Sequence, residues 1–113
     1  MVSRFTAASI RSAAPLFSAM GDPTRLSLVV HLTTSGPESI SSLSEGSNVS
    51  RQAITKHLRI LGDAGLVRSS RHGREHIWQL DPSGLATARR YLDRIDAQWD
   101  AAISRLRGHV EDE

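Results

Sequence analysis

A mainly α-helical fold with one small β-hairpin is predicted by three stretches of the chain. Residues 50–61 have the apolar spacing of an amphipathic helix, and residues 66–80 have the composition of two short strands around a glycine. Residues 84–107 repeat apolar side chains at spacings of three and four, which is typical of a helix that packs along another helix. The 113 residues suffice for a modest core, so we expect one domain over residues 1–113.

The helix predicted over residues 50–61 has one apolar face and one face rich in hydrogen-bond donors. The apolar face consists of Ile54, Leu58 and Leu61, and Ser50 stands where a hydroxyl caps the first turn. The other face carries no carboxylate and consists of Arg51, Gln52, Thr55, Lys56, His57 and Arg59. The DNA major groove displays acceptors at guanine and an amide-matching pattern at adenine, so it suits this face. For one helix alone, an ordinary solvated face is the alternative.

The segment before residue 50 completes a helix-turn-helix. Residues 39–45 can form only a short helix, with Ile40 and Leu43 inward, and Gly46-Ser47-Asn48 makes the turn. In such a pair the second helix enters the major groove.

Two further helices are predicted ahead of this pair. Residues 5–20 are alanine-rich, and a break or a second helix start is expected at Pro15. The next helix begins at Pro23 with Asp22 as its N-cap. Its buried face is expected to consist of Leu26, Val29 and Val30. Arg25 opposes the dipole of this helix, so we expect it to contact an anion, either a carboxylate or a DNA phosphate.

Two short strands, residues 66–70 and 76–80, are predicted after the second helix of the pair. Their link is Arg71-His72-Gly73-Arg74-Glu75, with a glycine where a hairpin needs positive φ. A basic hairpin at this place is a wing, and Arg71 and Arg74 are placed to lie along phosphates or in a narrow minor groove. The alternative is a merely solvated hairpin. The full prediction is a winged helix-turn-helix.

The last helix is predicted from about Gly84 to Arg107, opened by Asp81-Pro82-Ser83. An apolar seam runs along it over three heptads, through Leu85, Ala88, Leu92, Ile95, Trp99, Ala102 and Leu106. In a domain of this size, the seam favours a homodimer interface over a buried core helix, and Phe5 is expected to join that interface. Trp99 could line a ligand pocket, although packing is the simpler interpretation.

The charge of the chain is concentrated rather than large. The formal net charge is +2, but residues 50–76 hold six cations and two carboxylates, whereas residues 111–113 are all acidic. Such asymmetry favours an anionic partner at one face, most often nucleic acid. The chain has no cysteine, which removes disulfides and thiolate metal sites. No apolar run reaches membrane-spanning length, and Arg4 and Arg11 interrupt any signal-peptide core, so we expect a cytoplasmic protein without a membrane partner.

Four motifs resemble those of the ArsR-type winged-helix repressors. They are Gly-Asp-Pro-Thr-Arg-Leu at 21–26, Ser-Arg-Gln-Ala-Ile-Thr-Lys-His-Leu at 50–58, Ala-Gly-Leu-Val at 64–67, and a wing that ends at Leu80. The resemblance covers roughly residues 16–99. It implies a homodimer joined through its first and last helices, which binds an inverted-repeat DNA operator near its own promoter. It also implies that an inducer relieves repression, without identifying the inducer.

The metal sites of that family are not matched here. Arsenic-sensing relatives carry cysteines in the short helix before the turn, where this chain has Ser39 and Ser41. Zinc-sensing relatives use Asp-x-His, ten residues, then His-x-x-Glu or His. The residues at that spacing here are Asp96, Gln98, His109 and Asp112. Glutamine binds zinc poorly, and the family pattern begins near Asp81, four turns earlier, so we expect no metal and no cofactor.

Three alternatives to a DNA-binding repressor have different requirements. A winged helix used only for protein contact should carry apolar or acidic residues over 51–59, and this face carries neither. An enzyme should have a nucleophile–base pair, a phosphate-binding loop or paired carboxylates, and none is recognisable, so we expect no catalytic residues. A metal-responsive repressor of the same fold stays open as an alternative.

Overall fold

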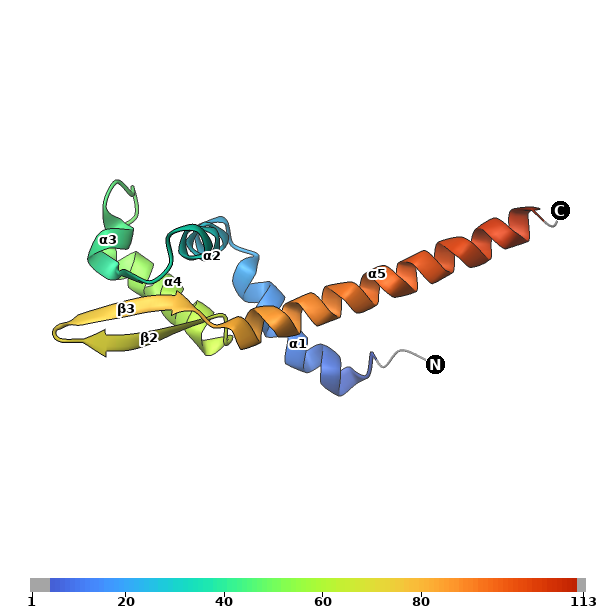
Figure 1. Ribbon diagram of the computed structural model, residues 1–113, viewed down its shortest axis with the longest axis horizontal. Coiled ribbons are helices and arrows are strands. Elements are labelled where there is room, and N and C mark those ends of the chain that lie inside the picture. The colour runs from blue at the N-terminus through green and yellow to red at the C-terminus, as the bar shows by residue number, and fades with distance from the viewer. Residues whose placement is uncertain (1–4, 112–113) are drawn as a thin grey trace.

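The computed structural model describes residues 5–111, in which five helices and a three-stranded sheet form a body with one projecting helix (Figure 1). The elements are α1 (Ala7–Met20), α2 (Pro23–Ser35), β1 (Glu38–Ser39), α3 (Ile40–Ser44), α4 (Arg51–Asp63), β2 (Val67–His72), β3 (Glu75–Leu80) and α5 (Pro82–Glu111). The predicted mainly helical fold with a wing is confirmed. The described residues do not include Arg4, which interrupts any signal-peptide core. They also do not include Asp112 of the zinc-sensor spacing or Glu113, and these two residues end the acidic segment.

The core forms where α4 meets α2 and the base of the wing. The predicted apolar face of α4 is confirmed, because Ile54, Leu58 and Leu61 are at most 2% exposed. The side chains that close around this face include Leu28, Val29, Leu32, Leu43, Leu66, Val67 and Trp78. Burial of these apolar side chains fixes which face of α4 is left for solvent or a ligand.

The buried face predicted for α2 is partly wrong. Val29 is buried as expected, but Leu26 and Val30 are 47% and 57% exposed, and Leu28 and Leu32 take their places in the core. Apolar residues lie on several sides of this helix, so spacing alone selects no single stripe. Packing against α4 decides which side is buried.

The break predicted at Pro15 is also wrong, because α1 continues through it as one helix of 14 residues. A proline inside a helix removes one backbone hydrogen bond and strains the preceding turn. Ala13, Leu16 and Ala19 are buried on both sides of this position. Their packing holds the helix in one piece, and Pro15 itself is exposed.

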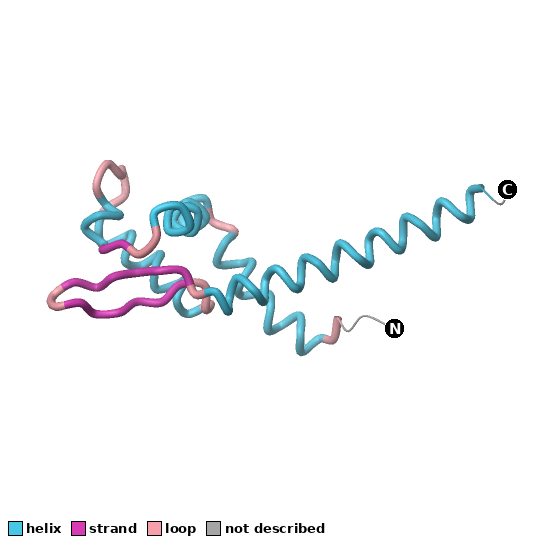
Figure 2. The backbone as a smooth tube through the Cα atoms, viewed as in Figure 1, coloured by secondary structure: helices cyan, strands magenta, loops and turns pink. Residues whose placement is uncertain are grey.

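The sheet is antiparallel with strand order β1-β3-β2 (Figure 2). The two-residue strand β1 was not predicted, and it pairs Glu38 with Trp78 and Ser39 with Ile77. The wing strands are also longer at the tip than predicted. Arg71 pairs with His76 and His72 pairs with Glu75, which leaves a turn of two residues. Gly73 in that turn has φ +65°, as the hairpin requires.

The start of α5 is held tightly to the end of α4. The helix begins at Pro82, two residues before the predicted start, and its long body reaches Glu111. Just before it, the Asp81 backbone N–H donates to the Leu66 carbonyl at 2.9 Å. The α-carbon of Gly84 lies so close to Gly65 that a β-carbon would stand 1.9 Å from the Gly65 carbonyl oxygen. Only glycine fits this contact, which fixes the direction of α5 relative to α4.

The predicted seam of α5 divides into two parts. Leu85 and Ala88, at its beginning, pack against the core of the same chain. The large side chains of the seam beyond them are half-exposed or more, and they are Leu92, Ile95, Trp99 and Leu106, whereas Ala102 is half-buried. No helix within residues 5–111 is both long enough and apolar enough to cross a membrane.

Candidate DNA-binding surface

The outer face of α4 presents long donor side chains to solvent. The Ser50 hydroxyl caps the helix by accepting from the Ala53 backbone N–H at 3.1 Å. Four donor side chains between Arg51 and Arg59 are exposed, and they are Arg51, Gln52, Lys56 and Arg59, while Asp63 is exposed at the C-terminal end of the helix. The predicted site residues on α4 therefore lie on a rigid helix that the core holds from behind.

Thr55 differs from its exposed neighbours. Its hydroxyl donates to the Arg51 backbone carbonyl at 2.8 Å, and its side chain is half-buried. The proton of this hydroxyl is already used, so Thr55 has only acceptor capacity left for a ligand. Threonine often makes this bond one turn back along a helix.

Two of the predicted DNA-binding side chains turn toward each other instead of toward solvent. His57 on α4 and Arg25 on α2 are both half-buried, with His57 Nδ1 3.4 Å from Arg25 Nη1. Arg25 Nε donates to the Ala19 carbonyl at 2.7 Å, at the C-terminal end of α1, where carbonyls lack helical partners. This cluster joins α1, α2 and α4, so it holds α4 in place.

The carboxylate of Asp22 contacts Arg25 through the backbone of that residue and not through its guanidinium group. The Arg25 backbone N–H donates to this carboxylate at 3.1 Å, and His57 Nδ1 lies 4.0 Å from it. The backbone hydrogen bond from Arg25, and then the nearby charges of Arg25 and His57, hold the pKa of Asp22 below its ordinary value of 3.8. Asp22 therefore caps α2 as predicted, and its charge interacts with Arg25 through space without forming one of the salt bridges within residues 5–111.

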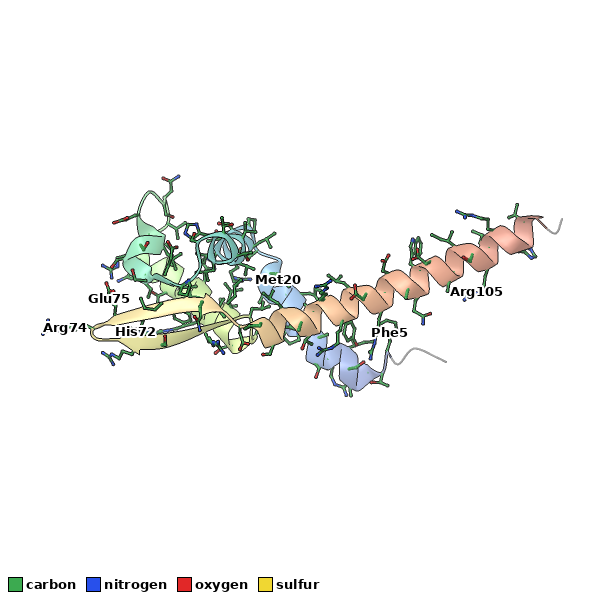
Figure 3. The ribbon with its side chains drawn as sticks, viewed as in Figure 1. Phe5, Met20, His72, Arg74, Glu75 and Arg105 are labelled. Carbon is green, nitrogen blue, oxygen red and sulfur yellow. The ribbon has the colours of Figure 1, made fainter. Side chains whose placement is uncertain are left out.

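The wing lies beside the start of α4, and its tip extends away from the body (Figure 3). Arg71 and Arg74 are both exposed, and Arg74 projects from the tip. A hollow of about 170 Å³ opens between α3, α4 and the wing, and its lining includes Arg51 and Arg74. Ser41 and His76 also line it, which sequence reasoning missed because only the fold brings these segments together.

Within residues 5–111, no cluster of three or more histidine, cysteine, aspartate or glutamate side chains is arranged to hold a metal ion. Among the candidates from the zinc-sensor spacing, Asp96 and Gln98 are exposed on the projecting part of α5.

A short helix and turn, a donor-rich second helix and an antiparallel wing define a winged helix-turn-helix DNA-binding protein. A family model described as "Helix-turn-helix domain" matches residues 20–70. The chain is 37% identical over 94 residues to the HTH-type transcriptional regulator Rv2034 of Mycobacterium tuberculosis. This match covers 83% of this chain and 84% of that protein. Among solved structures, the ArsR-like transcriptional regulator from Rhodococcus sp. RHA1 has 35% identity and a TM-score of 0.84, covering 96% of this chain and 99% of that one. The chain belongs to the ArsR family of winged helix-turn-helix transcriptional regulators.

A more distant protein, which is described as a homodimer, shares the fold. The homodimeric winged helix-turn-helix DNA-binding domain of Mb0332 from Mycobacterium bovis, a possible ArsR-family regulator, has 21% identity and a TM-score of 0.63. The match covers 87% of this chain and 89% of that domain. At this identity the likeness concerns the fold alone.

Proposed function

We propose that the protein is a homodimeric repressor that binds an inverted-repeat operator, including one near its own promoter. The observation that carries this proposal is the outer face of α4. It is backed by a fully buried apolar face, and its exposed side chains from Arg51 to Arg59 are all donors. A DNA major groove matches such a face in shape, charge and hydrogen-bonding pattern.

The roles proposed for the predicted DNA-binding residues follow their positions. Gln52 and Lys56, with Arg59, face outward to reach base edges and phosphates, while Ser50 fixes the helix start. Arg51 and Arg74 line the hollow beside the wing together with Glu75, so a DNA phosphate there would meet two guanidinium groups and one carboxylate, and Arg71 adds charge along the wing. Thr55 would accept from a donor on a base. Arg25 and His57 would act mainly by orienting α4, because their nitrogens already face each other.

The dimer proposed here uses α1 and α5. A groove of about 470 Å³ between these helices has an almost wholly apolar lining that includes Phe5, Phe17, Tyr91 and Ile95. The Phe5 ring meets the Tyr91 ring edge-on at 5.6 Å between centroids. The exposed side chains Leu92, Trp99 and Leu106 lie on the same face of α5 as Ile95, at helical spacings of three, four and seven residues. Contiguous apolar surface that a single chain leaves exposed is typical of a protein interface, and a second copy of this chain is the partner proposed for it, because two recognition helices must be held together to reach successive major grooves.

Gln52→Ala is expected to weaken operator binding by about 1–3 kcal/mol and to relax base preference at one position of each half-site. The reason is that a glutamine amide can pair in a bidentate way with adenine, and alanine offers no such pair. Binding to a library of operators with single base changes measures both effects. Gln98→Ala on α5 is the control with the same chemistry away from α4. Unchanged affinity and unchanged base preference for Gln52→Ala would refute this docking of α4.

Arg71→Gln and Arg74→Gln are expected to weaken binding to operator and to random DNA alike. Each lost phosphate contact should reduce the slope of log affinity against log salt by about one unit, because fewer counterions are released. Titrations at several salt concentrations give the slope, and Arg107→Gln on the projecting part of α5 is the matched control. A loss confined to the operator with an unchanged slope would mean that the wing reads bases.

A further inference from the structure

A second polar pocket lies where α1 and α5 cross, a region away from the wing (Figure 1). Its volume is about 220 Å³. The polar groups that line it are Ser9 and Ser12 of α1 and Thr87, Arg90, Tyr91 and Arg94 of α5. None of these residues belongs to the proposed DNA-binding surface.

Most of the hydroxyl groups in this pocket already donate hydrogen bonds to other groups of the chain. Ser9 Oγ donates to a backbone carbonyl one turn earlier at 3.0 Å, so the 2.7 Å bond to Tyr91 has the tyrosine hydroxyl as its donor. Thr87 Oγ1 donates to a backbone carbonyl at 3.0 Å and accepts from Arg90 Nη2 at 3.2 Å. What stays available to a ligand is the Ser12 hydroxyl and the remaining N–H groups of the two guanidinium groups. The pocket therefore offers mainly donors.

Arg90 and Arg94, which are both exposed, also bring positive charge to the pocket. Arg94 lies over the Tyr91 ring, with its guanidinium carbon 5.9 Å from the ring centroid, which holds it at the pocket. Within residues 5–111, the salt bridges join His31 to Glu38 and His57 to Asp22, and neither includes Arg90 or Arg94. No carboxylate lines the pocket. Two planar guanidinium groups match the paired oxygens of a carboxylate or a phosphate.

We propose that this pocket binds a small organic acid through its carboxylate, and that the acid is an effector of DNA binding. The role of the acid as an effector rests on the proposed function. The size of the pocket suits one carboxylate with a short or single-ring body. The pocket lies between α1 and α5, and the backbone contact of Gly84 with Gly65 ties α5 to the end of α4. If the DNA-free placement of α1 and α5 binds the acid more tightly than the DNA-bound placement does, the acid lowers operator affinity by the same factor.

Isothermal titration calorimetry of the full chain tests the site with acetate, benzoate and inorganic phosphate at constant ionic strength. We expect saturable binding of benzoate or acetate by the wild type. Arg90→Gln and Arg94→Gln should each weaken it by about tenfold or more, as loss of a charge-assisted hydrogen bond implies. Arg89→Gln is the matched control, because Arg89 is the exposed neighbour that does not line the pocket, and it should bind like the wild type.

Several results would overturn the proposal. Absence of saturable carboxylate binding, or equal binding by all four proteins, would remove the site, and binding of phosphate alone would remove the carboxylate. If the wild type binds no anion and Arg94→Gln weakens the dimer, the arginines would instead pair with a carboxylate of the partner subunit. Unchanged operator affinity at saturating carboxylate would exclude the effector role. Calorimetry needs no DNA, so a wild type that binds the acid but no operator refutes the proposed function and leaves the site standing.

Discussion

Ile95→Asp is expected to convert the proposed dimer into monomers and to reduce operator affinity to the level of non-specific binding. Ile95 is 50% exposed in the single chain, so a monomer can accept an aspartate there. In a dimer joined through α5, the same carboxylate would be buried without a partner, at several kcal/mol per subunit. Two recognition helices reach successive major grooves only when something rigid holds them about 34 Å apart. The loss of operator affinity should therefore be on the order of a thousandfold or more.

Sedimentation velocity and operator titration of the same samples measure the two effects of Ile95→Asp. The control is Ser104→Asp, which adds the same charge to an exposed position on the opposite face of α5. It should stay dimeric and bind the operator normally. An Ile95→Asp protein that is dimeric and binds normally would show that the dimer does not use this seam.

Leu58→Ala is expected to lower the free energy of unfolding by about 2–5 kcal/mol. Leu58 is 0% exposed and lies in the centre of the buried face of α4, so truncation leaves a cavity that the helix, the wing base and α2 surround. Loss of this magnitude is a large part of the stability of a small domain. Operator binding should weaken as well, since the same face supports the recognition helix.

Urea unfolding at one fixed protein concentration measures the effect of Leu58→Ala, because dimerisation makes stability depend on concentration. Leu26→Ala serves as the control: Leu26 is 47% exposed, and its truncation should cost about 1 kcal/mol or less. Equal losses for the two variants would contradict the assignment of the core.

The elements that could be predicted from the sequence are those whose cause is local. Asp22 and Pro23 start α2 by capping chemistry, and Ser50 starts α4 in the same way. The wing follows from a glycine between two apolar stretches, and Gly73 has the required positive φ. The apolar face of α4 follows from its spacing, since only one side of that helix is apolar.

The features that could not be predicted depend on contacts between distant segments. The buried side of α2 depends on where α4 packs, and Pro15 stays within α1 because its neighbours are buried. His57 has the spacing and chemistry of a DNA-reading residue, yet its ring faces Arg25, 32 positions away in the chain. No local pattern contains such a contact. In the same way, the first turns of α5 belong to the core while its later turns do not.

Hydroxyl-radical footprinting of the wild-type protein on the DNA upstream of its own gene tests the central claim most directly. A homodimer with two recognition helices should protect two patches, related by two-fold symmetry and centred about one helical turn, or roughly 10 base pairs, apart. The protected sequence should be an inverted repeat. A single protected patch without symmetry, or no protection at concentrations at which the protein is dimeric, would contradict a dimeric, autoregulatory DNA-binding repressor.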